Sequence, residues 1–291
     1  MFTINNFLLA PFMLVFLKPT RRKAEKLQMT SKRNIKNILG AGIFAVVLSL
    51  SGYSHAVVVN PGGDGPGTSL QDVFNAMTIA PTAGLSSINV NSDQLSDFMD
   101  SYWSISAAGG SVATIIVELA GFSNTNLFGL YDAVNPNLKV ELFGGLSSVG
   151  SQGIISILSD GSVYRNFVDT GINFSGNHFG YYLNSTAGGS SGGVFYSDTT
   201  LNTDGVDHMV AYQGKGIDTV QIANLAPGLW TTNEYALAWE DLKNGGDGDY
   251  QDFVVMVESI VPTAVPLPAA ALLFGSGLLG LIGAASRKKT A

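Results

Sequence analysis

Between residues 112 and 258 the sequence is a series of short apolar segments, each about the length of a strand. The clearest is 112–119, where Ala113, Ile115 and Val117 alternate with their neighbours at the two-residue period of a strand. Turn residues such as Asp160-Gly161 separate the segments. Short strands at this spacing predict an all-β fold, an antiparallel β-sandwich or jelly-roll-like domain over residues 57–260. The predicted strands are 112–119, 126–132, 138–143, 153–158, 163–168, 178–183, 194–196, 208–212, 219–222, 235–239 and 253–258.

Two segments ahead of these strands have helical spacing. Residues 69–77 predict a short helix with Ser69 as its N-cap. In 93–103 apolar residues recur at the helical period, which predicts a second helix or a turn. We therefore expect one or two short helices on the N-terminal side of the β domain.

Acidic residues are densest between the last two predicted strands. Residues 240–252 hold five carboxylates and a single Lys, Lys243. Carboxylates this close repel one another, and oxygen ligands on a flexible loop are what Ca²⁺ binds. The stretch predicts a Ca²⁺ site, with an ordinary solvated acidic loop as the alternative. The predicted ligands are Glu240, Asp241, Asp247, Asp249 and Asp252, with Asn202 and Asp204 on another acidic turn as weaker candidates.

The spacing of these acids does not make an EF-hand, because Asp252 occupies the loop position at which the sharp turn requires Gly. The acidic stretch instead resembles the end of the DUF4114 family, which consists of bacterial extracellular β domains of undefined biochemical role. Gln251 stands where that family more often has Asn. The resemblance covers about 139–258, and the segments that carry it are 194–197, 201–208, 238–241 and 245–255.

Charge and cysteine content exclude several classes of protein. From Asp64 to Glu258 there are twenty-one Asp and Glu residues against four Lys and Arg residues. So acidic a surface repels nucleic acid and anionic lipid and attracts divalent cations. Because the chain has no Cys, disulfides, zinc–thiolate sites and cysteine nucleophiles are excluded.

The N-terminal part of the sequence predicts export through the Sec machinery. Met29 opens a basic segment, residues 38–50 are apolar, and small residues flank His55. This order is typical of a secretory signal peptide over residues 29–56. Residues 1–28 are then a mis-assigned start or an extended leader. An unusually long signal or a membrane anchor is the alternative.

The C-terminal part predicts a membrane helix used for sorting. A Pro-rich linker, 261–268, precedes the helix at 269–291, in which 269–285 carries no charge. That is the short limit for a spanning helix, and the basic cluster after it is expected to stay cytoplasmic. These ordered parts resemble the PEP-CTERM sorting signal. The residues of the signal are Pro266, Leu267, Pro268, Arg287, Lys288 and Lys289.

The PEP-CTERM resemblance implies processing by an exosortase in a Gram-negative, polysaccharide-producing bacterium. An inner-membrane-anchored intermediate would precede release to the cell surface or the extracellular space. We therefore expect an exported, non-enzymatic protein that is a structural or adhesive component of an extracellular matrix or biofilm.

Two other functions stay open. A calcium-dependent carbohydrate-binding module would contact exopolysaccharide through aromatic side chains, for which the candidates are Tyr181, Tyr182, Trp230 and Trp239. A serine hydrolase would use Ser191, which lies in a Gly-x-Ser-x-Gly pattern, with Asp207 and His208. That pattern needs a strand, a sharp turn and a helix around the serine, and the sequence predicts a strand after it instead.

Overall fold

The computed structural model describes residues 57–62, 67–108, 110–118 and 124–263. None of the helices in these ranges has the length and apolar character that crossing a bilayer requires. The predicted leader (1–28), signal peptide (29–56) and sorting helix (269–291) lie outside the described residues, as do the sorting-signal residues from Pro266 to Lys289.

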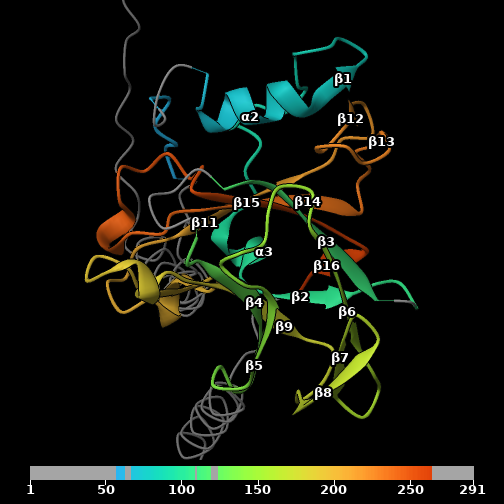
Figure 1. Cartoon of the computed structure of the whole chain (residues 1–291), viewed down its shortest axis with the longest axis vertical. Helices are drawn as coiled ribbons and strands as arrows, with labels where there is room; N and C mark the ends of the chain where they lie inside the picture. Colours follow the sequence, from blue (N-terminus) through green and yellow to red (C-terminus); the bar gives the residue numbers. More distant parts are fainter. Residues whose placement is uncertain (1–56, 63–66, 109, 119–123, 264–291) are drawn as a thin grey trace, which may run out of the picture. The chain divides into compact units, whose positions relative to one another are not determined.

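Two antiparallel sheets and a small third one make up the described domain (Figure 1). The larger sheet has seven strands in the order β11 (Met209–Gln213), β14 (Glu234–Trp239), β15 (Phe253–Glu258), β3 (Ser111–Glu118), β6 (Gln152–Ile157), β7 (Ser162–Arg165) and β8 (Val168–Asn173). The second has the order β16 (Ile260–Pro262), β2 (Trp103–Ile105), β9 (Phe179–Asn184), β4 (Leu127–Asp132) and β5 (Lys139–Phe143), and β10 (Val194–Tyr196) also pairs with β9. The third joins β1 (Thr78–Ala80), β12 (Thr219–Val220) and β13 (Gly228–Leu229).

The first core lies between the two large sheets. The ring of Phe128 on β4 lies 5.2 Å from that of Phe253 on β15 and 6.0 Å from that of Trp239 on β14, centroid to centroid. All three side chains are buried in one cluster with residues from both sheets. Aromatic pairs at these distances stabilise a core beyond the area they bury. The prediction of an antiparallel, sandwich-like all-β fold is confirmed.

Helices are short and few in the described part. The predicted helix is present as α2 (Leu70–Met77), and the side chain of Ser69 accepts a hydrogen bond from the Asp72 N–H as its N-cap. Of the second helix or turn predicted at 93–103, only α3 (Asp97–Asp100) is helical, and Trp103 already belongs to β2. The indole N–H of Trp103 donates to the Asp100 carbonyl at 2.9 Å, so a side chain binds a carbonyl at the end of the helix. The described residues also contain three 3₁₀ segments, η1 (Thr186–Gly188), η2 (Thr199–Leu201) and η3 (Lys243–Gly245).

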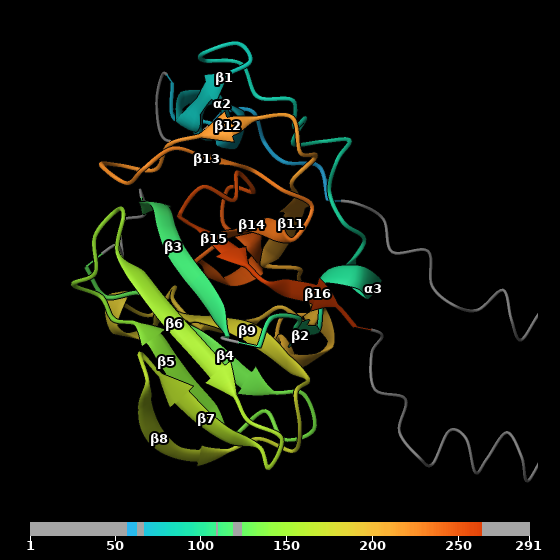
Figure 2. The same ribbon diagram turned by 90° about the vertical axis from the view of Figure 1, so that its right-hand side faces the viewer.

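A second core lies on the other face of the seven-stranded sheet. Along β14, Leu237 and Trp239 belong to the first core, whereas Ala236 and Ala238 belong to the second. Helix α2 covers this face with Phe74, and Figure 2 shows α2 and the small sheet on the side of β14 and β15 away from β9. Burial on both faces explains why β14 and β15 are almost continuously apolar in sequence.

One predicted strand, 163–168, in fact spans the turn of a hairpin. β7 ends before Asn166 and β8 begins after Phe167, and these two turn residues have φ of 49° and 66°. Two successive positive φ values give the tight turn that matches strand twist. Asn adopts this conformation readily but Phe seldom does, so the sequence gives little signal of a turn here. The short strands β1, β13 and β16 were also not predicted.

Candidate metal centre

The acidic loop joins β14 to β15, and strand register brings its two ends together. The last pair of the β14–β15 ladder is Trp239 with Phe253. Glu240 and Asp252 are therefore the first residues beyond that pair, so their backbones lie side by side where the loop begins and ends. The N–H of Asp241 donates to Asp252 Oδ2 at 3.0 Å and closes the base of the loop.

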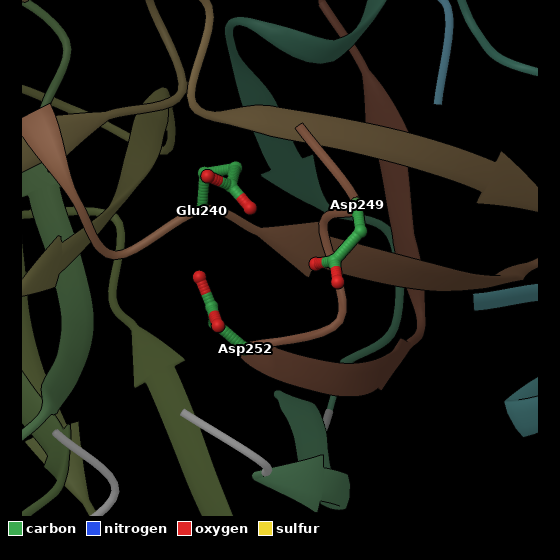
Figure 3. A group of neighbouring side chains, drawn as sticks. All are labelled: Glu240, Asp249 and Asp252. Atoms are coloured by element: carbon green, nitrogen blue, oxygen red, sulfur yellow. The ribbon is translucent and has the colours of Figure 1, made fainter. Parts of the chain in front are cut away.

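Three carboxylates converge inside this loop. Glu240, Asp249 and Asp252 each offer one oxygen, and these oxygens all lie within 4.8 Å of one another (Figure 3). Their side chains belong to residues that are 0%, 1% and 8% exposed, respectively. Two oxygens that bind one Ca²⁺ at roughly 2.3–2.6 Å lie at most about 5 Å apart. The spacing of this group, called the acidic triad below, fits a single cation.

Glu240 contributes an oxygen that has no hydrogen bond in the part of the chain that the structure describes. Its Oε1 accepts from the Tyr250 N–H at 3.3 Å, whereas Oε2 is buried and without a hydrogen-bond partner. A Cβ atom at Gly246 would lie 2.0 Å from Oε2, so the loop backbone closes over the carboxylate. An orphaned buried carboxylate oxygen is costly, and a cation would satisfy it.

Asp249 is held by Gln251, a residue that sequence reasoning noted but did not place at the site. The N–H and Nε2 of Gln251 donate to the two carboxylate oxygens of Asp249 at 3.2 and 2.8 Å. Gln251 is fully buried, and its Oε1 has no hydrogen bond among the described residues. The side chain orients Asp249 and leaves a second buried oxygen acceptor in the loop.

Burial and mutual repulsion raise the pKa of two members of the acidic triad. For Glu240 the largest cause is burial, followed by the charge of Asp252. For Asp252 burial again comes first, followed by the charge of Asp241. Both shifts mean that the ionised carboxylates need compensation, either from protons or from a bound cation.

The comparison with known families falls on this same region. Residues 172–259 match DUF4114, a domain of unknown function. The resemblance predicted from the sequence is thereby confirmed for these residues, although the match starts later than residue 139. No curated protein and no solved structure matches the chain.

The matched residues 172–259 contain the whole acidic triad, but the triad does not include all five predicted ligands. Asp241 turns toward Asn126, whose Nδ2 donates to Asp241 Oδ2 at 3.0 Å. Asp247 is exposed, and its carbonyl accepts from Asn60 Nδ2 at 3.1 Å. Its charge still contributes to the raised pKa of Glu240. The structure therefore selects three of the five predicted carboxylates as a group.

The two weaker candidate ligands, Asn202 and Asp204, stabilise a different turn through hydrogen bonds. The carboxylate of Asp204 accepts from the N–H groups of Val206 and Asn244 at 3.1 and 2.9 Å, and its Oδ2 lies 3.0 Å from His208 Nε2. Burial opposes these bonds, yet they lower the pKa of Asp204 to about 2. The side-chain amide of Asn202 forms hydrogen bonds with the backbone of Tyr196 and Val206. Neither residue belongs to the acidic triad.

The Gly-x-Ser-x-Gly segment lies against the acidic loop. Ser191 is exposed, its carbonyl accepts from the Lys243 N–H at 2.9 Å, and Lys243 Nζ donates to the Ser190 carbonyl at 2.9 Å. The segment leads into β10 and not into a helix. His208 is buried and stacks on Phe195 at 3.8 Å between ring centroids. Among the described residues, the segment is therefore attached to the acidic loop by these two hydrogen bonds. Lys243 is engaged in them and is not part of the acidic triad.

The aromatic side chains considered for carbohydrate binding are all inside the domain. Trp239 and Tyr181 lie in the first core, Trp230 in the second, and Tyr182 in a third cluster on the outer face of the six-stranded sheet. Each is at most 6% exposed. A sugar-stacking platform needs an exposed ring face, which these four residues do not offer.

Proposed function

We propose that this chain is an exported, non-enzymatic structural or adhesive protein whose β domain is stabilised by a buried Ca²⁺. The observation that carries the proposal is the acidic triad, whose three residues each offer an oxygen within 4.8 Å of the others. The Glu240 carboxylate also has a buried oxygen, Oε2, without a hydrogen bond among the described residues. Hard oxygen ligands from a loop are the chemistry that Ca²⁺ prefers. In this proposal the ion links the end of β14, the loop and the start of β15.

The burial of the acidic triad favours a structural ion over one that presents a ligand. A Ca²⁺ that binds sugar directly must keep coordination positions open to solvent. Here Glu240 and Asp249 are at most 1% exposed, and the most exposed member, Asp252, is 8% exposed. The carbohydrate-binding module remains the alternative. Saturable binding on a glycan array that EDTA abolishes would favour that alternative.

Export and surface sorting are part of the same proposal. Their support is the predicted signal peptide at 29–56 and the C-terminal sequence. A Pro-rich linker, an apolar run and a basic cluster follow one another there, and together they resemble the PEP-CTERM signal. The partners proposed are the Sec machinery, an exosortase and exopolysaccharide at the cell surface. Nucleic acid is not among the proposed partners, because so acidic a surface repels it.

The proposal is tested by calcium titration of the full-length chain. After treatment with EDTA, calorimetry is expected to show saturable Ca²⁺ binding. Glu240→Gln keeps the shape of the side chain but removes its charge, so it should weaken binding by about tenfold or more. Glu141→Gln on β5, where the side chain is 43% exposed, is the matched control and should leave affinity unchanged. Absence of Ca²⁺ binding, or equal affinity in Glu240→Gln, would refute the calcium site.

A further inference from the structure

A separate cavity of about 430 Å³ lies on the outer face of the seven-stranded sheet. Met256 of β15 forms part of its wall, and Ile222, Leu225 and Leu229 line it from the segment around β12 and β13. Met256 and Ile222 are each 9% exposed members of the second core, whereas Leu229 is 48% exposed. The cavity is therefore where the second core opens toward solvent, and its size is that of a small-molecule site.

Two carboxylates line this cavity beside the apolar side chains. Glu234 begins β14 and Glu258 ends β15, and the two residues are directly paired across the ladder. Their side chains therefore project on the same face of the sheet as Ala236 and Met256, at two-residue spacing. Like charges directly opposite each other destabilise a sheet. Burial, followed by the charge of Glu234, raises the pKa of Glu258.

No Lys or Arg of the described residues neutralises this pair, because all four are engaged elsewhere. The Glu234 carboxylate does accept a hydrogen bond from the Thr231 N–H, but that bond brings no charge. The four cations and their partners are Lys139 with the rings of Tyr182 and Tyr196, Arg165 with Glu141, Lys215 with Asp93, and Lys243 with the Ser190 carbonyl.

We propose that this cavity binds an alkylammonium group, with the aliphatic chain on the apolar wall and the ammonium between Glu234 and Glu258. An ammonium carries three hydrogen-bond donors and no acceptor, which suits two carboxylates that share a site. An aliphatic stem of about four carbons or more, as in a lysine side chain, would bury apolar surface on Met256 and Leu225. The source is a free amine or a lysine side chain of a partner.

This site is independent of the calcium proposal. Glu234 stands at the start of β14 and Glu240 beyond its end, so the two sites lie at opposite ends of one hairpin. Six residues of strand separate them by about 20 Å. Loss of Ca²⁺ binding in Glu240→Gln should therefore leave amine binding in place.

The test is calorimetric titration of the full-length chain with n-hexylammonium, using n-hexanol as the uncharged control of equal chain length. Hexylammonium is expected to bind saturably and at least about tenfold more tightly than hexanol. Glu234→Gln/Glu258→Gln should lose that preference. Glu258→Gln alone preserves the Glu234 bond to Thr231 and should weaken binding in a domain that remains folded. Glu141→Gln on the other sheet is the matched control.

A second titration separates the two sources of the amine. Tighter binding of Nα-acetyl-lysine methylamide than of hexylammonium, abolished by acetylating its side-chain nitrogen, identifies a lysine side chain. The reverse order identifies a free amine. Failure of both amines to bind, equal affinity for hexanol, or unchanged affinity in the two Gln variants would overturn the proposal.

Discussion

The backbone at Gly246 lies directly over the carboxylate of Glu240, because a Cβ atom there would be 2.0 Å from Oε2. Gly246 also has φ of +45°, a conformation that disfavours residues with a side chain. Closure of the acidic loop thus depends on the absence of a Cβ atom at residue 246. This relationship connects the sequence pattern Asn244-Gly245-Gly246 to the burial of the acidic triad.

Gly246→Ala should therefore destabilise the domain and weaken Ca²⁺ binding together. We expect a loss of about 2–4 kcal/mol in the free energy of unfolding, from backbone strain and from displacement of Glu240. Gly248→Ala is a matched control in the same loop, since its φ is +75° and no atom lies within 4 Å of the added Cβ. It should show the backbone cost alone, about 1–2 kcal/mol, with Ca²⁺ affinity retained. Denaturant unfolding and calcium titration of both variants measure the difference, and equal effects at 246 and 248 would contradict the closure argument.

The sandwich-like fold could be predicted because short segments with the two-residue period of a strand recur along the sequence and turn residues separate them. Short strands with turn signals give the class, and the acids between 239 and 253 mark the loop where carboxylates gather. The register of Trp239 with Phe253 then brings Glu240 and Asp252 together, which needs only adjacent strands with a hairpin connection. This part of the site follows from the sequence once the two strands are known to pair.

The choice of Asp249 over Asp247 could not be predicted in the same way. It depends on the path of a loop in which Gly246, Gly248 and Tyr250 all have positive φ. Tyr250 has φ of 56°, and a bulky residue in that region carries no sequence signal of its own. The orienting role of Gln251 also depends on that path, since its side chain bonds two residues back along the chain. Tertiary packing decides these positions.

The Asp204 carboxylate should stabilise the domain in a pH-dependent way. The pKa of Asp204 in the folded state is lowered to about 2, below its usual value of about 3.9, so its contribution is complete above pH 4. That contribution is lost as the pH falls from 4 through 2, because the carboxylate becomes protonated. Asp204→Asn should cost about 1–2 kcal/mol at pH 6 through the weakened bonds to Asn244 and His208.

Denaturant unfolding of wild type and Asp204→Asn between pH 6 and pH 2 tests this expectation. The difference between the two proteins should shrink toward pH 2. Asp169→Asn is the control, because the Asp169 carboxylate is an exposed group that accepts from the Gly171 N–H on β8. A difference for Asp204→Asn that stays constant with pH would show that the charge is not the stabilising element.

Removal of residues 265–291 should release the protein into the medium. The expected reason is loss of the apolar run and its basic stop, which would otherwise retain the chain in the membrane for sorting. Replacing Arg287, Lys288 and Lys289 by neutral residues should weaken retention without shortening the chain. Cell fractionation followed by mass spectrometry of the exported form measures both. An uncleaved wild-type chain that is already fully soluble in the periplasm would contradict this expectation.

Calcium should raise the thermal stability of the domain, and the effect should depend on Asp249 rather than on Asp247. A ligand that binds only the folded state at a hundred times its Kd adds about 2.7 kcal/mol. For a domain of this size that corresponds to a rise of about 5–10 °C in Tm between EDTA and millimolar Ca²⁺. Asp249→Asn removes a buried member of the acidic triad and should abolish the rise.

Asp247→Asn is the control that isolates geometry from charge. It removes the same charge from the same loop, but Asp247 is exposed and lies outside the acidic triad. It should therefore keep most of the Ca²⁺-dependent rise, with a small change because its charge acts on Glu240. If the two Asn variants lose the rise equally, the loop attracts Ca²⁺ through its total charge. If neither loses it, the stabilising ion lies elsewhere in the chain.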